Sequence, residues 1–252
     1  MATTTVYYSS QGRVDKTTGG TPSAAWATVR GSNTTTGNSV ASTGANENFA
    51  CKMEAARGCS VFTSNKRAYF YFDLSSIGTT ISSITFKARG GTNAANQNGD
   101  WIVARANSDN DFGTIATSDF ALVFNNSTNM TSYSNSSSTW NPNFGGNLGV
   151  NTISLNATAV SNANSGGASA QELCIGLINN TYDYENEDAE ENFGQLINGV
   201  ALASTGTGRA LLTVTHSSAG FGKNVNNVTA ANIVQINGVA TANITKLNGV
   251  SA

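Results

Sequence analysis

The run Arg67-Ala-Tyr-Phe-Tyr-Phe-Asp-Leu-Ser-Ser-Ile77 decides the fold class of this chain. In an extended strand, Phe70 and Phe72 fall on one face and the tyrosines between them on the other, a pattern typical of β structure. Asp73 ends the run, and the two serines that follow can hydrogen-bond turn amides. We therefore expect a strand here, with Asp73 as a turn-capping acceptor rather than as a ligand or catalyst.

Working outward, short apolar or alternating segments recur, with Gly, Asn, Ser and Thr between them. No long helical periodicity is present, and only residues 157–163 and 118–122 suggest short helices. This pattern predicts an all-β fold, an antiparallel β-sandwich, with a jelly roll as the specific form. The expected strands are residues 4–8, 68–74, 82–89, 101–106, 120–124, 150–155, 173–178 and 210–215. The expected core residues are Phe70, Phe72, Ile84, Phe86, Ile175, Leu177, Leu212 and Val214.

The composition narrows the classes of partner. Only 11% of the 252 residues are charged, and the net charge is −2 with no basic run. Binding to nucleic acid needs clustered Lys and Arg, so we do not expect a nucleic-acid partner. The sequence contains no stretch of about 18 apolar residues, so we expect no membrane-spanning helix. The N-terminal residues lack the basic and apolar regions of a secretory signal, so we expect synthesis in the cytoplasm without Sec export.

The C-terminal end repeats itself with a period of 11 residues: Ala231-Asn-Ile-Val-Gln-Ile-Asn-Gly-Val-Ala-Thr241 and Ala242-Asn-Ile-Thr-Lys-Leu-Asn-Gly-Val-Ser-Ala252. Asn-Gly flanked by apolar residues predicts a tight β-turn, and so short a repeat cannot bury its own apolar face. We expect this tail to be buried between chains or against another protein. The residues predicted to mediate assembly are Ile233, Ile236, Asn237, Gly238, Val239, Ile244, Leu247, Asn248, Gly249 and Val250.

These features divide the chain into a sandwich over residues 1–217, a linker over 218–227 and a repeat tail over 228–252. The order of the strands, with Trp26-Ala-Thr-Val-Arg30 early, the Phe-Asp-Leu-Ser-Ser-Ile segment and the closing Arg209-Ala-Leu-Leu-Thr-Val-Thr215, resembles jelly-roll modules of the DNRLRE and carbohydrate-binding-module type. Such modules occur in phage structural proteins and bacterial surface proteins. The terminal repeats look like the tails of phage structural proteins. Relatives often carry proline where this chain is rich in glycine.

The densest acidic cluster runs from Tyr182 to Asn192. Calcium prefers several converging oxygen ligands, which Asp183, Glu185, Glu187 and Asp188 could supply, although the EF-hand spacing is missing. A solvated acidic loop is the alternative interpretation, and otherwise no cofactor is expected. A second acidic stretch, residues 107–113, is a weaker candidate for the same ion.

Catalysis finds little support in the sequence. His216 is the only histidine, no Gly-x-Ser-x-Gly motif is present, and no carboxylate pair stands out, so we expect no enzyme activity. Trp140, in a loop, is the candidate for binding a ligand such as a glycan, or else for packing over one end of the sandwich. Trp26 and Trp101 are expected in the core, as is Cys174. Whether Cys51 and Cys59 form a disulfide stays open.

Three functions are compatible with these features. The first is a virion protein of a bacteriophage, as a capsid decoration, head fibre or tail-fibre-like component. It would associate with itself, as the homotrimers of similar fibres do, and with other virion proteins. The second is a carbohydrate-binding adhesion module that recognises host-surface glycans. The third is a filament subunit whose terminal strand completes a neighbour's sheet by β-strand addition.

Overall fold

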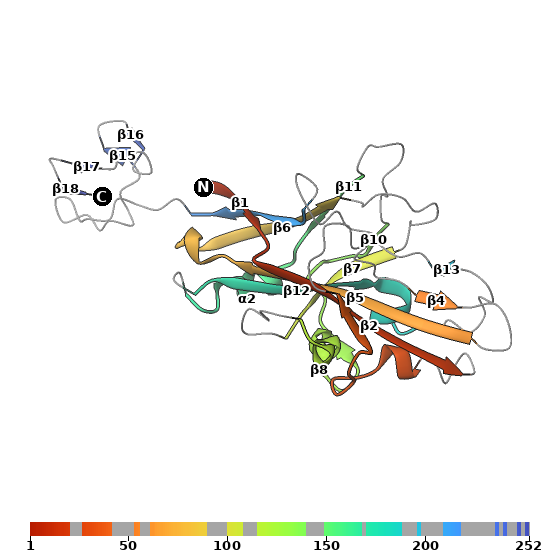
Figure 1. Ribbon diagram of the computed structural model, residues 1–252. Helices are drawn as coiled ribbons and strands as arrows, with labels where there is room; N and C mark the ends of the chain where they lie inside the picture. Colours follow the sequence, from red (N-terminus) through yellow and green to blue (C-terminus); the bar gives the residue numbers. More distant parts are fainter. Residues whose placement is uncertain are drawn as a thin grey trace.

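The computed structural model describes residues 1–20, 27–41, 53–55, 61–89, 100–107, 115–139, 149–167, 170–187, 196–197 and 209–217, and the tail segments 235–236, 239–240, 246–247 and 250–251. Two antiparallel sheets pack face to face as a β-sandwich, which confirms the predicted fold class (Figure 1). No helix in the described part of the chain is long and apolar enough to cross a membrane.

The smaller sheet has the order β1-β14-β6-β11. Every pairing in it is antiparallel, and the first strand of the sandwich lies beside its last, with Ala2 opposite His216. Its strands are β1 (Ala2–Tyr7), β6 (Ile81–Arg89), β11 (Val150–Ser154) and β14 (Leu211–His216).

The larger sheet has the order β10-β7-β12-β5-β2-β3, and β4 and β13 pair off this path. The chain crosses between the sheets at every connection of the long strands except that from β2 to β5, which gives a jelly-roll-like alternation. The strands are β2 (Ser10–Gly20), β3 (Ser39–Ala41), β4 (Met53–Ala55), β5 (Val61–Asp73), β7 (Asp100–Arg105), β10 (Ser138–Thr139), β12 (Glu172–Asn179) and β13 (Leu196–Ile197).

The core lies between the sheets. All eight residues predicted to form it are buried, and the Phe70 and Phe86 rings, from opposite sheets, lie 5.8 Å apart. Trp101 and Cys174 are also buried, as predicted. Trp26 lies outside the described residues.

Short helices cover the structure outside the sheets. They are η1 (Ser75–Ile77), η2 (Thr117–Val123), α2 (Ala157–Asn164) and the π-helical η3 (Asn180–Tyr184), and a small hairpin of β8 (Phe124–Asn126) and β9 (Asn129–Met130) follows η2. The helix predicted over residues 157–163 is confirmed, and the side chain of Asn156 caps it by accepting a hydrogen bond from Ala159 N–H. The strand predicted over 120–124 is wrong, because most of this segment belongs to η2.

The helix η2 covers the face of β5 that points away from the other sheet (Figure 1). Tyr69, on that face, is fully buried, and its hydroxyl donates to the Phe120 carbonyl at 3.1 Å. Gly176 of β12 permits the close approach, because a Cβ atom there would lie 2.5 Å from the Val123 side chain. Both faces of β5 are therefore buried over residues 67–70.

Candidate functional site

Asp183, the first residue of the predicted calcium cluster, lies in a buried ion pair. Its two carboxylate oxygens accept hydrogen bonds from Arg67 Nε at 2.7 Å and from a terminal guanidinium nitrogen at 2.6 Å. Both side chains are fully buried. This bidentate geometry matches the planar guanidinium to the carboxylate.

Further bonds tie two other segments to this pair, η2 and residues 27–30. Arg67 also donates to the carbonyls of Phe120 and Arg30, each at 2.7 Å, and its guanidinium lies over the Phe120 ring at 4.0 Å. Arg30, in the helical residues 27–30, donates in turn to the Asp183 carbonyl at 2.7 Å. Burial lowers the pKa of Arg30, and the nearby Asp183 opposes that shift. The network therefore fastens η2, η3 and residues 27–30 to the outer face of β5.

Asp183 is therefore neither part of a solvated acidic loop nor open to calcium, because both of its carboxylate oxygens bond to Arg67 in the protein interior. Glu185 and Glu187 are exposed, and Glu185 accepts a hydrogen bond from Asn180. Asp188 and most of the second candidate stretch, 107–113, lie outside the described residues. Where the chain is described, no three acidic, His or Cys side chains are grouped to hold a metal. Calcium binding by Glu185, Glu187 and Asp188 stays a prediction.

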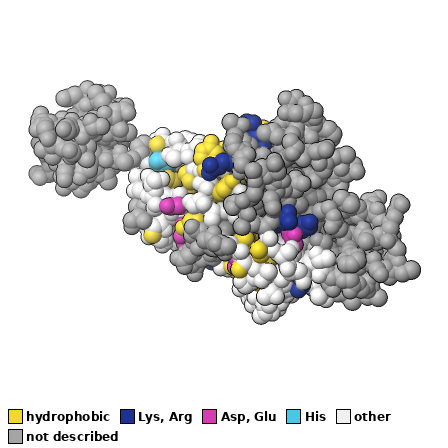
Figure 2. Space-filling model, in the orientation of Figure 1, with side chains coloured by type: hydrophobic (Ala, Val, Ile, Leu, Met, Phe, Trp, Pro, Cys, Tyr) yellow, Lys and Arg dark blue, Asp and Glu magenta, His cyan; other side chains and the backbone are white. Residues whose placement is uncertain are grey.

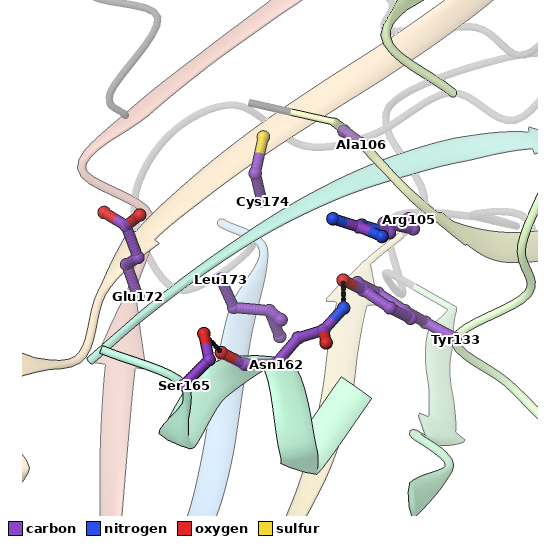
Figure 3. A pocket seen from close by; sticks show the side chains of 8 residues that line it. All are labelled: Arg105, Ala106, Tyr133, Asn162, Ser165, Glu172, Leu173 and Cys174. Atoms are coloured by element: carbon purple, nitrogen blue, oxygen red, sulfur yellow. Dashed lines mark hydrogen bonds between the residues drawn. The ribbon is translucent and has the colours of Figure 1, made fainter. Parts of the chain in front are cut away.

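A cavity of about 90 Å³ lies where β12 extends past the end of β7 (Figure 3). Strands β7 and β12 and helix α2 supply most of its lining. Arg105, Tyr133 and Asn162 lie on one side of β12, and Glu172 and Cys174 on the other. Its polar side-chain groups are therefore a guanidinium, a phenol, an amide, a carboxylate and a thiol, together with the hydroxyl of Ser165.

Hydrogen bonds fix three of these groups: the amide, the phenol and the carboxylate. Asn162 donates to the Tyr133 hydroxyl at 2.7 Å, and Glu172 accepts from the Tyr71 hydroxyl at 2.8 Å. Burial raises the pKa of Tyr133, so the phenol stays protonated and can donate in its turn. The thiol of Cys174 is buried and is not in a disulfide. Sequence reasoning missed this cavity, because its lining residues are distant in the chain and meet only where a strand ends.

His216, the only histidine, takes part in a structural hydrogen-bond group. Nδ1 lies 2.8 Å from the Ser217 carbonyl and 2.9 Å from Thr79 Oγ1, and Nε2 lies 3.0 Å from Thr4 Oγ1. A carbonyl can only accept, so Nδ1 carries a proton, and Nε2 shares a hydrogen bond with the Thr4 hydroxyl. These partners are uncharged, and they join β1, the turn before β6 and the end of β14.

The tail forms two hairpins, β15–β16 (Gln235–Ile236 and Val239–Ala240) and β17–β18 (Lys246–Leu247 and Val250–Ser251). Ile236 pairs with Val239 in the first hairpin, and Leu247 pairs with Val250 in the second, at the equivalent positions of the repeat. Two residues separate the paired positions in each case, as a tight turn requires. Trp140, Cys51, Cys59 and the remaining predicted assembly residues lie outside the described residues.

Comparison of the sequence with models of protein families and with curated proteins gives no match. The fold and these sites define the chain as an antiparallel β-sandwich protein with a hairpin-repeat tail.

Proposed function

We propose that this protein is a non-enzymatic structural component of a bacteriophage particle, as a capsid decoration, head fibre or tail-fibre-like protein. The sandwich is displayed, and the C-terminal repeats mediate self-association or attachment to other virion proteins. The resemblance of the strand order and of the terminal repeats to phage structural proteins supplies the viral part of this proposal.

The pair of tail hairpins carries the proposal. Within the described residues, each hairpin pairs only with itself, and its strands join neither sheet of the sandwich. An isolated two-stranded hairpin is marginally stable in water, so hairpins this short gain stability by packing against a partner. The tail is also nearly free of charge, since Lys246 is the only ionised side chain in residues 228–252. Uncharged open strands favour pairing with another chain.

The surface and His216 support a structural role. In the face that Figure 2 shows, uncharged polar side chains and backbone cover much of the described surface, and charged groups are scattered. Such a surface suits stable display better than recognition of a charged partner. The single histidine is held by hydrogen bonds to the neutral groups of Thr4, Thr79 and Ser217. None of these partners is the carboxylate that orients the histidine of a hydrolase triad.

Deleting every residue after Gly222 tests the proposal. We expect the shortened chain to keep a folded sandwich but to lose one of two activities. The first is self-association, measured by light scattering, and the second is binding to phage particles that lack this protein, measured by co-sedimentation. The full-length chain is the control in both assays. A shortened chain that keeps both its native mass and its particle binding would contradict the proposal.

The cavity beside Arg105 favours a second candidate function, recognition of a glycan on the host surface. Guanidinium, carboxylate, amide and phenol groups are suited to hydrogen bonding with sugar hydroxyls, and the space of about 90 Å³ admits a small group. A glycan array, with Arg105→Ala as the comparison variant, tests this function. If the unchanged protein binds no glycan on the array, or if Arg105→Ala binds as well as the unchanged protein does, the cavity is not a glycan site.

A further inference from the structure

Strand β1 is an edge strand of the smaller sheet. It pairs with β14 over six residues without a register shift, from Ala2 opposite His216 to Tyr7 opposite Leu211. Within the described residues, no strand pairs with its other side. It is longer than the edge strands β11, β10 and β3.

The hydrogen bonds of β14 show which residues of β1 face outward. Ser217 N–H donates to the Thr80 carbonyl, on the side of β6. Backbone N–H and C=O groups alternate in direction along a strand, so those of His216 point to β1 and to its partner Ala2. By the same alternation, Thr3, Thr5 and Tyr7 present their N–H and C=O groups to the open side of β1. Their side chains are exposed as well.

This edge lacks the features that usually prevent strand addition. Residues 2–7 contain no charged residue and no proline, and their pairing contains no bulge. Proteins commonly protect edge strands with Lys, Pro, bulges or short length. An uncharged and regular edge is instead a surface on which another strand can add through main-chain hydrogen bonds.

We propose that the open edge of β1 accepts a strand of the C-terminal tail from a second copy of this chain. The inference rests on the proposed role of the tail in assembly. The tail strands suit the edge because they too are almost uncharged and have unpaired outer sides within the described residues. The described part of the sandwich also ends beside β1, since Ser217 follows His216, the residue opposite Ala2.

The direction of the chain favours a second copy over the chain's own tail. Strand β14 runs antiparallel to β1 and ends beside the first residues of β1. A segment that continued directly from Ser217 along the open edge would run parallel to β1. Parallel pairing is slightly weaker per residue, whereas a strand from another copy can approach in the antiparallel direction.

Two matched proline variants test which edge is used. Thr5→Pro removes an outward N–H from β1 and keeps the ladder with β14, as proline on an edge strand can. Thr152→Pro is the control on β11, the other edge of the same sheet. Leu155 N–H donates to the Ile84 carbonyl of β6, so Thr152, three residues earlier, faces outward. We expect Thr5→Pro to be monomeric and Thr152→Pro to assemble like the unchanged chain, by light scattering.

A mixing experiment then tests exchange between copies. The full-length Thr5→Pro chain has a tail but a blocked edge, and the unchanged sequence ending at Gly222 has an open edge but no tail. We expect each to be monomeric alone and the mixture to form one-to-one complexes. Hydrogen exchange gives an independent measurement: the amides of Thr3, Thr5 and Tyr7 should exchange more slowly in the full-length assembly than in the shortened chain.

The outcomes separate this inference from the proposed function. If the chain ending at Gly222 assembles normally and binds particles, the proposed function itself fails. If that chain is monomeric but Thr5→Pro still assembles, or if the mixture forms no complex, only the β1 inference is overturned. Slow exchange of the β1 amides in a monomeric full-length chain would show that the chain's own tail covers the edge and would also overturn it.

Discussion

Arg67 and Asp183 are 116 positions apart in the chain, yet each is fully buried and bonded to the other. A buried ion pair of this kind is costly to break from one side, because the remaining charge is left in the interior without a partner. Its bonds also reach η2 and residues 27–30. The pair therefore decides whether the layer of short helices stays on the outer face of β5.

The substitution Asp183→Asn should be strongly destabilising. The neutral amide would leave the Arg67 cation buried without its counter-charge, and we expect the free energy of unfolding to fall by about 3–5 kcal/mol. Urea denaturation measures this loss. Glu187→Gln, at an exposed acid in the same part of the chain, is the control and should have little effect. The double variant Arg67→Met with Asp183→Leu should be more stable than Asp183→Asn; if it is less stable, the unpaired charge is not the cause.

Asp73 confirms the turn-capping role that the sequence predicts, since its Oδ1 accepts from Ser75 N–H at 2.9 Å. Hydrogen bonds from the side chain and backbone of Ser75 hold the pKa of Asp73 below its ordinary value. The folded-state pKa is thus below the unfolded one, so the contribution to stability is present above the unfolded pKa and is lost as the pH falls through the folded pKa. We expect Ser75→Ala to raise the pKa of Asp73 in an NMR titration. An unchanged pKa would show that the serine hydroxyl has no part in the shift.

At the scale of elements, local sequence predicts some strands and misses others. The strand β5 is readable because its aromatic residues alternate. The strand β2 has no such pattern, since Ser10–Gly20 contains three glycines and three charged residues, yet it pairs with β5 over all eleven residues. Pairing with a neighbour, rather than local propensity, therefore makes β2 a strand. The segment of η2 is ambiguous in the sequence, which predicts a strand over 120–124 and a short helix over 118–122, and it forms a helix where it covers Arg67 and Tyr69.

The core role of β5 is tested by Phe72→Ala. The ring is fully buried between the sheets, and its removal leaves a cavity. We expect a loss of about 3–5 kcal/mol in the free energy of unfolding, measured by chemical denaturation. Val150→Ala, at an exposed position of edge strand β11, is the control and should change little. A Phe72→Ala protein with an unchanged melting temperature would refute the core placement.

The hairpins of the tail make a further prediction. If Asn237-Gly238 and Asn248-Gly249 form the turns, replacing both glycines by Val should weaken assembly, because β-branched residues resist positive φ. The effect should be milder than that of deleting the tail, and light scattering measures it. Ala240→Val, in strand β16, is the matched control, because valine is favourable in a strand. Equal behaviour of the two variants would argue against these turns.

At the scale of the whole molecule, the sandwich and the tail share no strand pairing within the described residues. We therefore expect the chain ending at Gly222 to unfold in one transition at a temperature that does not depend on protein concentration. If the tail joins copies, the full-length chain should melt at a temperature that rises with concentration, since association stabilises the folded state by mass action. Scanning calorimetry over a range of concentrations measures both. A full-length melting temperature that is independent of concentration would contradict self-association.

The sequence by itself determined the β class, most of the long strands, the eight core residues and the repeated tail. These features depend on local alternation and turn chemistry, which neighbouring residues specify. Only the tertiary structure decided that β2 is a strand and that Tyr69 is buried on the outer face of β5. It also decided that Asp183 pairs with Arg67 rather than facing solvent with its acidic neighbours. Those outcomes depend on contacts between segments far apart in the chain, and the pattern of nearby residues carries no information about which distant segment covers a given face.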